Sequence, residues 1–162
     1  MESLNDILKR HVEINGRDFE HREINVSLDL DPDMPTIYPD QLSQEGTPEF
    51  INRMLGELTG EQTDAHLFDK GLTKLRYGTV FVDGVQYLIV EHNGKVVPNE
   101  TLDKLNANFE RIAKGEQRQG RVTGNVRAAL QAYSGNGEIN MENHSDREYK
   151  VETTVKIPLP SE

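Results

Sequence analysis

The chain has 162 residues, with 28 Asp and Glu against 18 Lys and Arg, which gives a formal net charge of −10. It contains no cysteine, and this excludes disulfides, thiolate nucleophiles and cysteine-ligated zinc or iron–sulfur centres. Because no apolar stretch is long enough to span a membrane and no secretory signal is visible, we expect a cytoplasmic protein, or one of a host cytoplasm.

The first part of the chain predicts a helix followed by a strand. Ser3 can cap a helix whose first turn contains Asp6, and the apolar residues that follow recur every three or four positions until Gly16. Residues 22–30 alternate between apolar and polar, which indicates a half-buried strand with one acidic face. Two prolines end this strand, and residues 31–46 are expected to form a loop.

The middle of the chain predicts a helix and then a meander of strands. Thr47-Pro48-Glu49 is a strong helix start, and we expect that helix to run to Gly60. Asp83-Gly84 and Asn93-Gly94 are two-residue hairpin turns, so residues 73–97 predict a three-stranded antiparallel meander. Its middle strand is apolar on both faces, which favours a central position in the sheet.

The last third of the chain predicts two helices and a hairpin. We expect helices over residues 99–115 and 125–133, joined by a flexible glycine-containing loop at 115–125. Residues 138–157 alternate around a turn and predict a hairpin with a long final strand, which its closing prolines place at a sheet edge.

These elements predict a single α+β domain over residues 1–162. We expect an antiparallel sheet of about five to six strands, with the central meander 73–97 and the C-terminal hairpin 138–157, and with helices packed on one face.

The charge is unevenly distributed along the chain. Residues 1–60 hold 5 Lys and Arg against 13 Asp and Glu, a net charge of −8, whereas residues 111–127 have a net charge of +4. The acidity therefore belongs to the first third of the chain, and a basic window lies well after it.

Four acidic residues stand out as candidates for binding a partner: Asp29, Asp31, Asp33 and Asp40. Their spacing matches the opening and the last position of a calcium loop, but Met34 occupies the position where glycine must make the turn. We expect a solvated acidic turn, with a weak cation site and a partner-binding role as the alternatives. The five histidines form no local zinc-ligand pair, so we predict no metal site and no cofactor.

A second candidate site is the basic loop over residues 115–127. Residues 120–125, GRVTGN, lead into a predicted helix whose first backbone N–H groups can hold an anion. The arginines that would assist in anion binding or in self-association are Arg118, Arg121 and Arg127. Neither a P-loop nor a GxGxxG motif is present, which weakens this assignment.

Three functions are compatible with these features. We rank first a non-enzymatic inhibitor or adaptor whose acidic N-terminal third binds a basic partner, for which a nucleic-acid-binding protein is the natural example. The alternative is a structural subunit that forms a homo-oligomer, as a bacteriophage accessory or virion protein would. The second alternative is a small-ligand or nucleotide-binding enzyme that uses the 115–127 loop. Direct binding to nucleic acid or to membranes is not expected, and no catalytic residue is assigned.

Overall fold

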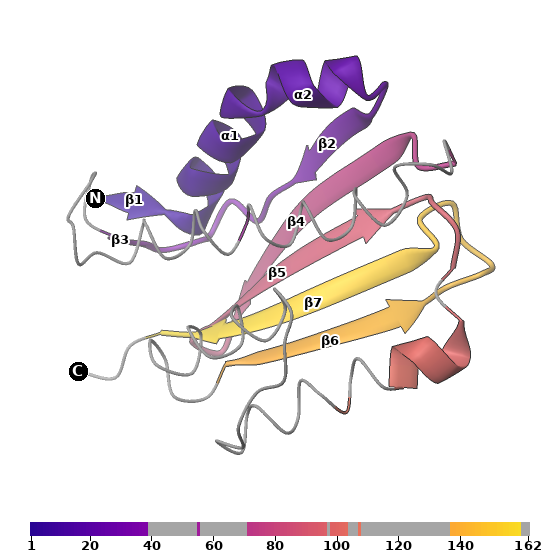
Figure 1. Cartoon of the computed structure of the whole chain (residues 1–162). Helices are drawn as coiled ribbons and strands as arrows, with labels where there is room; N and C mark the ends of the chain where they lie inside the picture. The colour runs from indigo at the N-terminus through magenta and orange to yellow at the C-terminus, as the bar shows by residue number, and fades with distance from the viewer. Residues whose placement is uncertain (39–54, 56–70, 97, 104–106, 108–136, 160–162) are drawn as a thin grey trace.

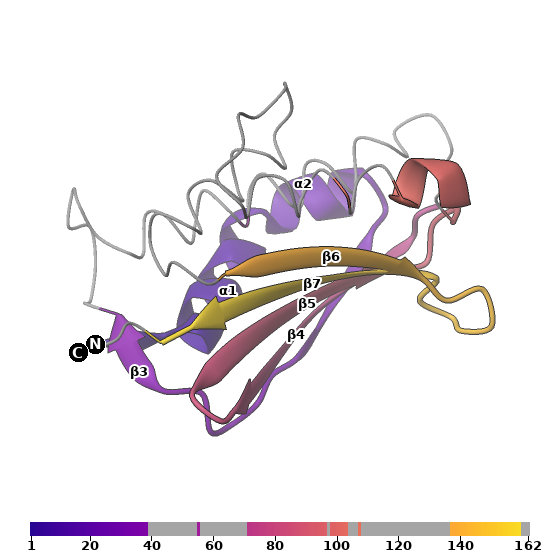
Figure 2. The same ribbon diagram turned by 90° about the horizontal axis from the view of Figure 1, so that it is seen from below.

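The computed structural model describes residues 1–38, 55, 71–96, 98–103, 107 and 137–159. Within this part of the chain a twisted sheet lies under a layer of helices (Figure 1). Figure 2, which views the sheet nearly edge-on, shows helices α1 and α2 and the helical residues 99–103 on the same side of it. We call the sheet face toward α1 and α2 the inner face and the opposite one the outer face.

The elements follow one another as a short strand, two helices, two more short strands, a hairpin and a second hairpin. They are β1 (Glu2–Ser3), α1 (Leu4–Ile14), α2 (Gly16–His21), β2 (Asn25–Asp29), β3 (Thr36–Tyr38), β4 (Lys74–Val82), β5 (Val85–His92), β6 (Glu138–Asn143) and β7 (Val151–Pro158). The main sheet has the order β2-β4-β5-β7-β6, and β1 pairs with β3 separately. No helix among the described residues is both long and apolar enough to cross a membrane.

The α+β class is confirmed, but the sheet is mixed rather than purely antiparallel. Strand β2 runs parallel to β4, with Val26 opposite Leu75, whereas every other pair in this sheet is antiparallel. A parallel pair needs a long crossover connection, and the segment between Asp29 and Lys74 is long enough to make one. Local sequence patterns carry no information about this direction.

Helix α1 begins as the sequence predicts. The Ser3 hydroxyl accepts a hydrogen bond from the Asp6 amide at 3.2 Å, and the Asp6 carboxylate accepts one from the Ser3 amide at 2.9 Å. This capping box satisfies two of the N–H groups that a helix start leaves unpaired. Gly16, however, does not end the helical region, because α2 starts there and buries Phe19 in the core.

The hairpin between β4 and β5 is confirmed, but the third strand of the predicted meander is wrong. Asp83 and Gly84 adopt positive φ angles of 51° and 74°, as a type I′ turn requires. Lys95 and Val96 are not in a strand. The second neighbour of β5 is instead β7, which pairs with it from Val85 opposite Pro158 to His92 opposite Val151.

The C-terminal hairpin of β6 and β7 is confirmed, yet its last strand is not at an edge. Strand β7 lies between β5 and β6, and β6 forms the edge of the main sheet. The alternating residues of β7 on the inner face, Val151, Thr153, Val155 and Ile157, are all buried. Of the two prolines that suggested an edge, Pro158 is the last residue of the strand, and Pro160 lies outside the described residues.

Most of the remaining helix predictions lie outside the described residues. Of the predicted 47–60 helix only Leu55 is described, and it is helical and fully buried. Residues 99–103 and 107 are helical, as predicted for the 99–115 helix. The expected loop at 115–125 and the 125–133 helix fall entirely outside this part of the chain.

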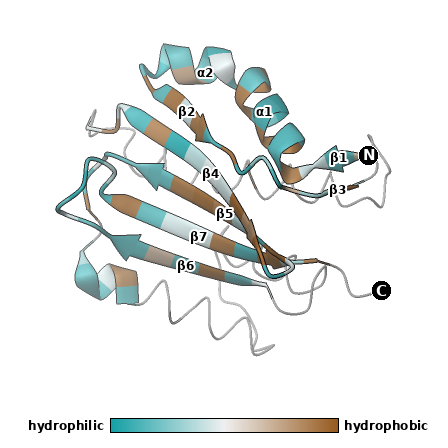
Figure 3. Ribbon diagram, turned by 180° about the vertical axis from the view of Figure 1, so that it is seen from behind, coloured by the Kyte–Doolittle hydropathy of each residue, from teal (hydrophilic) through white to brown (hydrophobic). Residues whose placement is uncertain are grey.

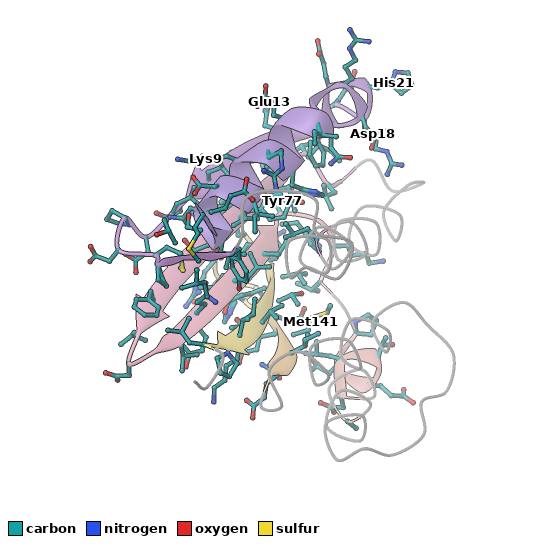
Figure 4. The ribbon with its side chains drawn as sticks, turned by 90° about the vertical axis from the view of Figure 1, so that its left-hand side faces the viewer. Lys9, Glu13, Asp18, His21, Tyr77 and Met141 are labelled. Carbon is teal, nitrogen blue, oxygen red and sulfur yellow. The ribbon has the colours of Figure 1, made fainter. Side chains whose placement is uncertain are left out.

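The core fills the space between the inner face and α1. Leu4, Ile7 and Leu8 of α1 are fully buried, together with Leu88 and Val90 of β5. The opposite side of the helices is polar, and Figure 4 shows Lys9, Glu13 and His21 pointing away from the sheet. Along the ribbon, the hydrophobic residues of β4 and β5 gather toward the hairpin that joins these strands (Figure 3).

Replacing Ser3 by alanine removes one half of the capping box, and we expect the free energy of unfolding to fall by about 1 kcal/mol. Urea denaturation followed by circular dichroism measures this change. Ser145→Ala, in an exposed part of the loop between β6 and β7, is the matched control. An unchanged urea midpoint for Ser3→Ala would contradict a stabilising cap.

His11 makes the stability of the fold dependent on pH. It lies on the buried side of α1, only 7% exposed, with its ring edge-on to Tyr77 at 5.7 Å between centroids. Burial lowers the pKa of His11 below its ordinary value of 6.5, since the charged ring would lose its hydration.

The unfolded chain binds a proton at His11 near pH 6.5, while the folded chain does so only at lower pH. The free energy of unfolding should therefore decrease as the pH falls from about 6.5 toward the lowered pKa, and be unaffected by His11 above that range. Urea titrations from pH 7.5 to 5 measure the slope. His11→Gln should flatten it, and the same substitution at exposed His21 controls for the loss of a histidine.

Candidate functional site

The sequence-predicted acidic residues lie at the end of β2 and in the turn that follows. Asp29 is the last residue of β2 and pairs in register with Gly78. Asp31 and Asp33 belong to one turn, and Asp40 lies outside the described residues. Among the described residues these carboxylates do not form a metal-binding cluster. Their role in binding a partner stays a prediction.

Asp31 is the centre of a hydrogen-bonded ring that joins three elements. Its carboxylate accepts hydrogen bonds from the amides of Phe81 at 2.8 Å and Asp33 at 2.9 Å, and its own amide donates to the Thr79 hydroxyl at 2.9 Å. Thr79 in turn donates to the side-chain oxygen of Asn5 at 2.7 Å, and the Asn5 amide group donates to the Asp31 carbonyl at 2.7 Å. Asp31 thus ties the turn to both α1 and β4.

The hydrogen bonds from the Phe81 and Asp33 amides hold the pKa of Asp31 below its ordinary value. Its carboxylate is therefore ionised and engaged within the protein. This structural role could not be inferred from the spacing of the acids along the chain.

A second polar arrangement fixes the point where the chain leaves β5. The Asn93 side-chain oxygen accepts hydrogen bonds from the amides of Thr73 and Lys74, each at 2.9 Å, and its amide group donates to the Thr73 hydroxyl at 2.8 Å. The buried His92 ring accepts a hydrogen bond from the Gly94 amide at 3.0 Å through Nδ1. The Asn93-Gly94 pair, which predicted a hairpin, instead directs the chain into the helical residues 99–103 on the inner side of the sheet (Figure 2).

The outer face carries a row of charged side chains that the sequence analysis did not find. Arg76 on β4 forms an ion pair with its register partner Glu91 on β5, with nitrogen–oxygen distances of 2.8 and 3.1 Å. The Arg76 guanidinium also lies 4.2 Å from the centre of the Tyr149 ring. The loop between β6 and β7 thus folds back over the outer face. The predicted anion-binding residues Arg118, Arg121 and Arg127 lie outside the described residues.

Solved structures resemble this fold over nearly its whole length, whereas no family model and no curated protein matches the chain. The catalytic domain of the histidine kinase ThkA superposes with a TM-score of 0.72 at 17% identity, covering 99% of this chain and 96% of that one. The ATP-binding domain of PrrB from Mycobacterium tuberculosis gives 0.68 at 17% identity, with 98% and 96% covered. The Acinetobacter baumannii histidine kinase AdeS gives 0.64 at 18% identity, with 99% of this chain and 66% of that chain covered.

The fold is thus that of the histidine-kinase ATP-binding domain, and this finding contradicts our first functional hypothesis. These matches contradict the hypothesis of a non-enzymatic acidic adaptor or inhibitor. They also contradict the expectation that the chain is more likely not an enzyme. The suggestion of a viral accessory or assembly protein draws no support from them either. The nucleotide-binding alternative is the one that they favour. Net charge was a poor guide to function here because it reports on solubility and steering and carries no information about fold.

Asp31→Ala should lower both the melting temperature and the urea midpoint, because the amides of Phe81 and Asp33 lose their acceptor inside the fold. Asp33→Ala is the matched control, since it removes an equal charge from the same turn but keeps the backbone amide that donates to Asp31. Differential scanning calorimetry of both variants measures the effect. Equal melting temperatures for the two variants would show that the ring of hydrogen bonds contributes nothing beyond charge.

Proposed function

We propose that this chain is a nucleotide-binding domain of the histidine-kinase type, which binds ATP and presents it for phosphoryl transfer. The observation that carries the proposal is the likeness to a catalytic domain over 99% of this chain and 96% of the other. A partial match to a common supersecondary motif would carry much less weight, because such motifs recur with unrelated functions.

The distribution of charge supports this proposal. ATP is a polyanion, and a protein with a net charge of −10 repels it unless a basic region lies where the phosphates bind. The window 111–127, with its net charge of +4, is such a region. Within it, the glycine-containing residues 120–125 precede a predicted helix start, where backbone N–H groups and nearby arginines favour phosphate. A cytoplasmic location, where ATP is abundant, agrees with this function.

Binding of Mg²⁺–ATP to the whole chain, measured by isothermal titration calorimetry, tests the proposal. We expect one site per chain that also accepts ADP, with raised thermal stability in the presence of nucleotide. Arg121→Ala and Arg127→Ala should each weaken ATP binding about tenfold or more, since a hydrogen bond to a charged group contributes about 1.5–3 kcal/mol.

Arg17→Ala is the matched control, because it removes an equal charge at an exposed position of α2 and should leave the affinity unchanged. A chain that is folded by circular dichroism yet binds no nucleotide at millimolar concentration would overturn the proposal. Wild-type affinity in both arginine variants would place the phosphates elsewhere.

A further inference from the structure

One group of metal-ligating side chains gathers on the outer face, at the end of the hairpin formed by β6 and β7. It consists of Glu142 on β6, His144 in the loop and Glu152 on β7, and one potential ligand atom from each lies within 4.8 Å of the others. Among the described residues this is the only such group of three or more. The three residues come together through strand register, which sequence spacing alone does not reveal.

The register places like charges directly opposite one another. Glu142 is the partner of Glu152, and Glu152 is also the partner of Glu91, so three glutamates form a row across β5, β7 and β6. Directly opposed like charges destabilise a sheet. Glu91 is neutralised by Arg76, whose guanidinium lies 2.8 Å away.

Glu142 and Glu152 accept hydrogen bonds from Asn140 at 3.1 Å and Thr154 at 3.3 Å, but no lysine or arginine of the described residues lies as close to them as Arg76 does to Glu91. Arg147 approaches Glu152 only to 3.7 Å, and its side chain is 57% exposed. It is thus a weak partner for Glu152, and within the described part of the chain it forms no ion pair with Glu142, whose side chain is 55% exposed. A cation shared by the two carboxylates would balance their opposed charges.

The His144 ring lies between these two carboxylates. Its Nε2 atom is 3.5 Å from an oxygen of Glu142 and 3.4 Å from an oxygen of Glu152. This nitrogen is buried from solvent and makes no hydrogen bond. Two ligand atoms that each lie about 2.0–2.1 Å from a tetrahedral zinc ion are about 3.4 Å apart, so the two distances from Nε2 match a shared metal, and the third pair of ligand atoms lies within 4.8 Å.

We propose that Glu142, His144 and Glu152 bind a zinc ion, with water completing the coordination. The ion balances the two opposed glutamates, gives the buried nitrogen a partner and pins the loop between β6 and β7 to the outer face. One imidazole and two carboxylates form a mixed nitrogen and oxygen donor set that zinc accepts. The site lies on the sheet face opposite α1 and α2, and the inference does not rest on the proposed nucleotide binding.

The test is titration of the whole, EDTA-treated chain with ZnCl₂ by isothermal titration calorimetry, with Co²⁺ as a spectroscopic probe. We expect one zinc ion per chain, visible absorption of the Co²⁺ form typical of a tetrahedral site, and a higher melting temperature with zinc. His144→Gln and Glu152→Gln should each weaken zinc binding by at least about tenfold, and should abolish the Co²⁺ spectrum.

Glu138→Gln is the matched control. Glu138 lies on the same strand and the same outer face but opposite Lys156, so its substitution should leave zinc affinity unchanged. Glu142→Gln provides a third ligand variant in case one of the others fails to fold. Absence of zinc binding, or equal binding by wild type and His144→Gln, would overturn the proposal.

Discussion

The central strand β5 is hydrogen-bonded along its whole length on both sides, and this double pairing organises the molecule. One neighbour is β4, which directly precedes β5 through a two-residue turn, and the other is β7, which comes from a distant part of the chain. Because the backbone of β5 is satisfied within the sheet, its alternate side chains are free to pack on two separate faces. Leu88 and Val90 on the inner face are fully buried and require the helical layer that α1 provides.

A ring of hydrogen-bonded polar groups beside this helical layer gives a structural role to some acidic residues of the N-terminal third. The Asp31 carboxylate accepts a hydrogen bond from the Phe81 amide of β4, while Asn5 and Thr79 close the ring between α1 and the sheet. Asp6 likewise completes the capping box of α1. Some of the negative charge that suggested a partner-binding surface is therefore used to position elements within the domain.

The two faces of the sheet carry different chemistry. The inner face supports the hydrophobic core and the exit of the chain after β5, where Asn93 fixes the start of the next segment. The outer face concentrates charge at one end, where Arg76 balances Glu91 and a further pair of opposed glutamates surrounds His144.

The elements that could be predicted are those whose signals are local. The capping residues Ser3 and Asp6 predict the start of α1, and Asp83-Gly84 predicts a tight hairpin turn. The alternation of apolar and polar residues along β7 predicts a strand. Only the tertiary structure decided that β2 runs parallel to β4, that β7 displaces the expected third strand beside β5, and that Glu142, His144 and Glu152 meet. These outcomes depend on pairing between segments far apart in the chain, where burial and loop closure select the partner and neighbouring residues carry no signal.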